Sequence, residues 1–191
     1  SGAVEPTAVQ AEIEKRLGAP WKATPAQAVE VPGPAMHRAE PIYLVDAPGS
    51  AQTGFYLVFP GQKIGAATEP QTRLGTVVLG GTFTSRLNAL LREKRGYTYG
   101  ASAGLNSLHH GGTLTVRTRI RTDVTAPALV DTLTELESIR KGITAEELAK
   151  AQGAFRQDVV ASLESVGGTA GAFSDAHEAG FAPDFLVTEL A

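Results

Sequence analysis

The sequence predicts an α+β fold, in which an antiparallel sheet carries helices packed on one of its faces. The first observation is the order of the expected elements: strands, helices, strands and helices, without the regular alternation of a parallel sheet. The second is a pair of strand patterns, 97–108 and 112–121, which a short glycine-containing loop joins into an antiparallel hairpin. The third is composition: 42% apolar and 19% charged residues are ordinary for a globular protein and argue against general disorder.

Composition and charge exclude several classes of function. The 20 acidic and 17 basic side chains give a formal net charge of −3, and no basic block provides a surface for nucleic acid. The absence of cysteine excludes disulfides, thiol catalysis and Cys-bound metal. No apolar stretch is long enough for a membrane span. Bacterial periplasm and cytoplasm both remain open as compartments.

The first 40 residues are expected to be a lead-in to the domain that occupies residues 41–191. Residues 6–17 have a weak apolar stripe and are followed by Gly18, which predicts a short helix. Five prolines interrupt the segment 18–41, so it is expected to be a linker or an extended strap.

The domain is expected to begin with two strands and two helices. Residues 42–45 and 52–59 are apolar strand candidates, and the turn residues Asp46–Gly49 separate them. Residues 68–79 then predict a helix that Gly80-Gly81 ends, and 85–94 predict a second helix with a leucine stripe.

The segment 112–121 is the clearest strand. Its alternation places one set of side chains on one face, namely Leu114, Val116, Thr118 and Ile120. The opposite face then carries Thr115, Arg117, Arg119 and Arg121.

The remaining chain is expected to be helical. The helix 125–141 has a predicted core stripe of Leu129, Val130, Leu133 and Leu136. Thr144 and Glu147 form a capping box that opens the next helix. A further helix is expected to reach about Ala179, and the last to begin at Pro183. Because that last helix has no stop signal, we expect the domain to be truncated at its C-terminus.

No metal or phosphate site is expected in this chain. The four histidines (His37, His109, His110 and His177) lack the spacing of H-E-x-x-H and of its inverted form H-x-x-E-H, and surface positions explain them adequately. Neither a glycine-rich nucleotide loop nor a G-x-S-x-G nucleophile elbow occurs.

The most informative stretch is 79–101, which combines a helix stop, a capped helix, a glycine and a strand. Arg92 lies in the last turn of that helix, and Tyr97 and Tyr99 share a parity on the strand. A fixed cation and a phenolic hydroxyl at one spot suit a peptide carbonyl or a developing oxyanion. The alternative is structural, because arginines in a last turn often serve the helix dipole and strand tyrosines often pack.

This stretch resembles the signature of the C-terminal half-domains of the pitrilysin/insulinase (inverzincin) family of zinc metallopeptidases. The residues that carry the resemblance are Gly80-Gly81, Ser85-Arg86-Leu87, Leu91–Gly96 and Tyr99. The opening strand at 42–46 and the downstream hairpin and helices agree with it, so the resemblance covers roughly residues 40–190. It implies an α+β roll related to the ferredoxin-like fold.

The resemblance also implies a division of labour between two halves, in one chain or in two subunits. One half carries the inverted zinc motif, whose zinc activates a water and whose Glu takes the proton. The other half binds no zinc and supplies an Arg–Tyr pair separated by six residues, a spacing that Arg92 and Tyr99 share. This chain therefore resembles the non-zinc-binding half, and the fragment alone is expected to be inactive.

The resemblance assigns Arg92 and Tyr99 as catalytic residues that orient the backbone of a peptide or unfolded polypeptide and stabilise the tetrahedral oxyanion. Tyr97, Arg117 and Arg119 are expected to contact substrate, and the arginine face of 112–121 to hold acidic peptide segments. A simple solvated sheet face is the alternative for those arginines. The alternative for the whole chain is an inert structural or assembly subunit of the same family.

Overall fold

The computed structural model describes residues 2–18, 42–182, 184–185 and 188 of the 191-residue chain. The chain divides into two compact units, one comprising residues 1–31 and 159–191 and the other residues 32–158. The site described below lies in the second unit. The predicted linker and most of the helix expected from Pro183 lie outside the described residues.

Two helices lie wholly within the described residues of the first unit. Helix α1, Pro6–Ile13, has proline in its first turn and continues as a wider π-helical turn, Glu14–Gly18. Helix α5, Val166–Glu178, begins at Ser165, whose hydroxyl oxygen accepts a hydrogen bond from the Gly168 N–H at 3.0 Å. Both helices lie where the sequence predicts them.

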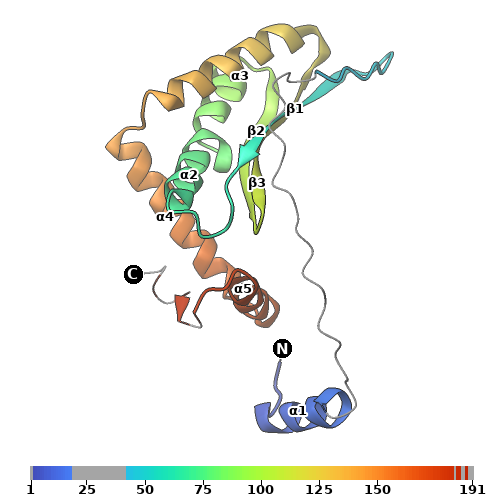
Figure 1. Ribbon diagram of the computed structural model, residues 1–191. Helices are drawn as coiled ribbons and strands as arrows, with labels where there is room; N and C mark the ends of the chain where they lie inside the picture. Colours follow the sequence, from blue (N-terminus) through green and yellow to red (C-terminus); the bar gives the residue numbers. More distant parts are fainter. Residues whose placement is uncertain (1, 19–41, 183, 186–187, 189–191) are drawn as a thin grey trace. The chain divides into compact units, whose positions relative to one another are not determined.

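The sheet of the second unit has three antiparallel strands in the order β1-β3-β2 (Figure 1). The strands are β1, Gln52–Gly61; β2, Thr98–Leu108; and β3, Gly111–Arg121. β2 and β3 form the predicted hairpin, and β1 pairs with the other edge of β3, with Tyr56 opposite Arg117. The β2–β3 register shifts between Thr98 and Ala101, which is the position of a β-bulge.

The strand expected at 42–45 does not form. Ile42, Tyr43, Leu44 and Val45 have no regular structure, and their exposed fractions are 93%, 84%, 91% and 86%. A strand pattern gives a strand only where a partner backbone satisfies its N–H and C=O groups. No described segment pairs with these four residues.

Helices of the second unit follow the predicted order. They are α2, Glu69–Thr76, with its π-helical continuation Val77–Gly81; the π-helical segment Asn88–Lys94; α3, Thr125–Arg140; and α4, Ala145–Ser162, whose residues from 159 onward belong to the first unit. A short 3-10 turn, Thr122–Val124, joins β3 to α3. The α4 start has the predicted capping box, since the Thr144 N–H donates to Glu147 at 2.8 Å and the Glu147 N–H donates to Thr144 at 3.2 Å.

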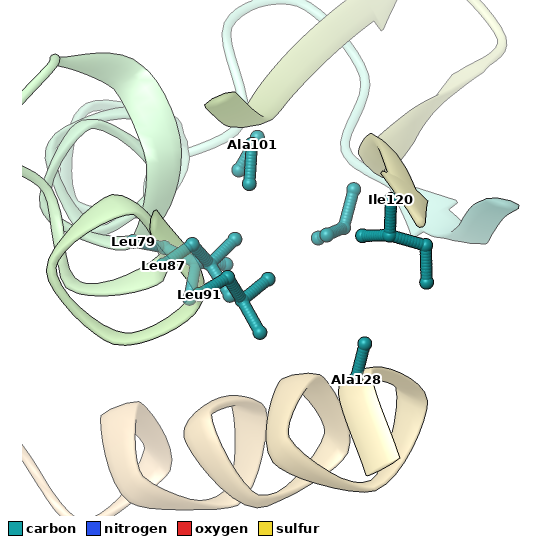
Figure 2. Close-up of a cluster of buried hydrophobic side chains, with 8 residues drawn as sticks. Leu79, Leu87, Leu91, Ala101, Ile120 and Ala128 are labelled. Atoms are coloured by element: carbon teal, nitrogen blue, oxygen red, sulfur yellow. The ribbon is translucent and has the colours of Figure 1, made fainter. Parts of the chain in front are cut away.

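The core lies between these helices and one face of the sheet. Figure 2 shows Leu79, Leu87 and Leu91 facing Ile120 of the sheet and Ala128 of α3. The other members of the buried cluster are Ala101, Ala103 and Val116. This arrangement confirms the predicted α+β fold with helices on one sheet face.

The predicted core stripe of α3 is partly wrong. Val130 is 62% exposed and Leu133 is 45% exposed, whereas Ala128 and Thr132 are fully buried. Leu136 packs against the core as predicted. The helix therefore turns its 128 and 132 positions inward, and small residues allow the close approach of α3 to the sheet.

Candidate functional site

The face of the sheet opposite the core is exposed and polar. Along β3, side chains alternate between the buried Val116, Thr118 and Ile120 and the exposed arginines at 117, 119 and 121. β1 follows the same rule, with Tyr56 64% exposed between the half-buried residues of the core face. The predicted parity of β3 is thus confirmed.

A shallow groove of about 430 Å³ lies on this exposed face. All three strands contribute to it, so the hairpin and the β1–β3 pairing together create it. Its lining residues are Gln52, Tyr56, Thr98, Tyr99, Gly100, Ser102, Arg117, Thr118 and Arg119.

The β-bulge presents Tyr99 to the solvent at this groove. Thr98 fixes the bulge, because its hydroxyl donates to the Arg119 carbonyl at 2.6 Å and lies 3.0 Å from the Thr118 hydroxyl. The Thr98 hydroxyl also accepts from the Gly100 N–H at 3.0 Å. Tyr99 itself is 90% exposed, so its phenol is available to a ligand.

Arg92 lies in the last turn of the π-helical segment, and its side chain contacts the neighbouring residues Phe83 and Glu93. Its guanidinium carbon stacks 3.7 Å from the centroid of the Phe83 ring. Nη1 lies 3.2 Å from a Glu93 carboxylate oxygen. That contact lacks hydrogen-bond geometry, so Nη1 is a buried donor without a hydrogen-bond partner among the described residues.

The groove brings together three of the five predicted site residues, namely Tyr99, Arg117 and Arg119. Arg92 does not line it, and no described hydrogen bond joins Arg92 to Tyr99. Tyr97 is half-buried and packs against the core. The proposed roles of all five residues toward a substrate stay predictions.

Sequence reasoning missed Tyr56 and Gln52 as groove residues. Both residues are at the alternate positions of β1 that face solvent, and this alternation is the sequence signal that could have identified them. The β1–β3 register places Tyr56 beside Arg117, two residues that are 61 positions apart in the sequence. A local pattern does not specify such a pairing.

The described residues do not fit a zinc ion. Among them, no group of three or more His, Asp or Glu side chains converges. In the same part of the chain, no helix has the length and apolar character that crossing a membrane requires.

Comparison with known proteins identifies the family. A family model described as the peptidase M16 inactive domain matches residues 1–155. A search of curated proteins finds no significant match. The solved structures that share the fold include a peptidase M16 inactive domain, a protein described as a zinc protease and a periplasmic protease.

Three solved structures illustrate the fold. A peptidase M16 inactive domain from Pseudomonas fluorescens matches with a TM-score of 0.80 and 23% identity, over 99% of this chain and 44% of that chain. A protease from Helicobacter pylori matches with a TM-score of 0.76 and 20% identity, over 99% and 47%. A chain of complex III2 from Candida albicans matches with a TM-score of 0.61 and 9% identity, over 74% and 37%.

This chain spans less than half the length of each of these structures. At such identities the structural likeness shows the fold alone, and the family is shown by the match over residues 1–155. The resemblance stated from residues 79–101 is thereby confirmed. The chain belongs to the family of peptidase M16 inactive domains.

Proposed function

We propose that this domain is the non-zinc-binding half of a zinc metallopeptidase, in which it binds peptide substrate and helps stabilise the tetrahedral intermediate. The observation that supports this function best is the open groove that joins Tyr99, Arg117 and Arg119 on the exposed sheet face. In this proposal a partner half-domain holds the zinc, in the same chain or in a second subunit. The described residues of this domain contain no group of three or more His, Asp or Glu side chains that could hold a metal ion.

The chemistry of this half is hydrogen bonding and charge. The Tyr99 hydroxyl and the Arg92 guanidinium are donors suited to a peptide carbonyl and to the oxyanion formed from it. Arg92 has a buried Nη1 donor that no described hydrogen bond uses. Arg117, Arg119 and Tyr97 extend the proposed contact surface along the peptide.

Substitution in the assembled enzyme tests these roles. Arg92→Ala and Tyr99→Phe should each lower kcat/KM for a peptide, by about 100-fold if they act as oxyanion donors. Arg140→Ala is the matched control, since Arg140 is exposed on α3 and Glu137 is its one ion-pair partner among the described residues. Unchanged kcat/KM in both site variants would refute the proposed catalytic role.

The second candidate is an inert structural or assembly subunit. The family description calls the domain inactive, and the fold also occurs in complex III2 from Candida albicans. The discriminating observation is the partner. A partner half with H-x-x-E-H supports the peptidase, and a partner without it supports the structural subunit.

A further inference from the structure

The groove is cationic in a chain that is acidic overall. The net charge of the protein is −3, yet the groove lining contains two arginines and no Asp or Glu. Arg86, Arg95 and Arg121 each contact a carboxylate. Arg117 instead donates to the Ser102 hydroxyl at 3.1 Å, and within the described residues neither Arg117 nor Arg119 has a carboxylate at ion-pair distance. Both cations therefore remain available to an anionic ligand.

The spacing of these cations matches an extended peptide. Residues two apart on one face of a strand are separated by about 6.8 Å, and an extended ligand repeats its side chains at the same distance. Arg117 and Arg119 lie two residues apart on the exposed face of β3. In a peptide that lies along β3, carboxylates on every second residue would therefore have the same spacing as Arg117 and Arg119, and each could pair with one arginine.

The neighbouring side chains leave room for such a ligand. Gly54 lies opposite Arg119 on β1, so no side chain covers the arginine from that strand. Tyr56 lies opposite Arg117 and, with Tyr99, adds an aromatic surface and a hydroxyl to the groove. These features favour a peptide over a small isolated anion.

We propose that this groove binds extended peptides with acidic residues at alternate positions, Glu-x-Glu, and that Arg117 and Arg119 determine this specificity. The proposal rests on the proposed function as a peptide-binding half. It adds a substrate class, and it assigns the two arginines to substrate affinity rather than to the chemical step.

Kinetics of the assembled enzyme, with its zinc-bearing half, test the proposal. Three peptides are compared: one with Glu at alternate positions, one of the same composition with adjacent Glu, and one with Gln for Glu. The alternating peptide should have the lowest KM, and its advantage should fall as salt is raised. The double variant R117Q/R119Q should raise that KM about tenfold and change kcat little.

Arg140→Gln is the control, because it removes the same charge from an exposed site on α3. Equal KM values for the three peptides, or an unchanged KM in R117Q/R119Q, would overturn the proposal. Failure of the acidic specificity can be distinguished from failure of the proposed function. If only the specificity is wrong, Arg92→Ala and Tyr99→Phe still lower kcat/KM for the Gln peptide.

If the assembly hydrolyses no peptide, the proposal is tested by measuring peptide binding. Fluorescence anisotropy of the labelled alternating peptide then measures binding directly. Binding that R117Q/R119Q abolishes, with Arg140→Gln unaffected, supports the proposal. Absence of binding by the unmodified assembly contradicts it.

Discussion

At the residue scale, Arg86 connects three helical segments through one guanidinium. It donates to Glu147 of α4 at 2.6 and 2.8 Å and to the Gly142 carbonyl at 3.0 Å. It also lies 3.6 Å from Glu135 of α3. Its side chain is only 18% exposed, so this bidentate pair is shielded from water more than an ordinary surface ion pair.

Arg86→Met should therefore lower the free energy of unfolding by about 2 kcal/mol, the cost of leaving hydrogen-bonded charged groups without a partner. Urea denaturation of the purified chain measures this. Arg140→Met breaks an exposed pair with Glu137 and should change stability by less than about 0.5 kcal/mol. Equal effects of the two substitutions would contradict the role of Arg86.

Glu147 gives the same contact a pH dependence. Its hydrogen bond from Arg86, helped by the Thr144 N–H, lowers its pKa from 4.5 to about 2. A depressed folded-state pKa contributes stability that is fully present above the unfolded value, near 4.5, and is lost as pH falls through about 2. Between pH 4.5 and about 2, Glu147 is protonated in the unfolded chain and still ionised in the folded chain, so lowering the pH favours unfolding.

The difference in unfolding free energy between the native chain and Glu147→Gln should thus shrink between pH 5 and pH 2, by at most about 1.4 kcal/mol per pH unit. Denaturation curves at several pH values give this difference, because other carboxylates titrate alike in both proteins. A difference that stays constant across the window would show that Glu147 is not the responsible group.

At the element scale, the π-helical segment Val77–Gly81 lies directly against β2. Gly80 is buried, and a Cβ added there would collide with the backbone N and the Cβ of Ala103. The absence of a side chain at position 80 therefore sets the distance between this helix and the sheet. That distance in turn positions the Leu79 side chain in the core.

Gly80→Ala should destabilise the domain by about 2 kcal/mol, because the colliding atoms are strand backbone and the Ala103 Cβ, which moves only with that backbone. Gly75→Ala is the matched control: it lies in α2 with open space around it and should stabilise by about 0.5–1 kcal/mol through helix propensity. Thermal unfolding of both variants measures these changes in stability. A neutral Gly80→Ala would mean that the helix–sheet distance is not fixed there.

The sequence predicts those elements whose cause is local. The hairpin, the Thr144–Glu147 capping box and the arginine face of β3 all depend on patterns within a few residues. Long-range pairing decides the rest. Tyr56 reaches the groove through the β1–β3 register, and Ile42–Val45 lacks a described partner strand. Val130 is exposed because packing selects one of several apolar faces of α3.

At the scale of the whole molecule, the proposed function places metal binding and substrate binding in different halves of the peptidase. The described residues contain no metal cluster, while the groove gathers a phenol and two arginines. We predict that the purified chain holds no stoichiometric zinc when its metal content is measured by mass spectrometry. Tightly bound zinc at one ion per chain would contradict the assignment of the metal to the partner half.

The central claim is that this inactive domain completes a peptidase. The most direct measurement is the rate of peptide hydrolysis by the isolated zinc-bearing half as this chain is titrated into it. We predict a rate that rises and saturates with the native chain, and a much lower plateau with Arg92→Ala or Tyr99→Phe. A rate that does not change on addition of the native chain, or one that all three chains raise equally, would contradict the account.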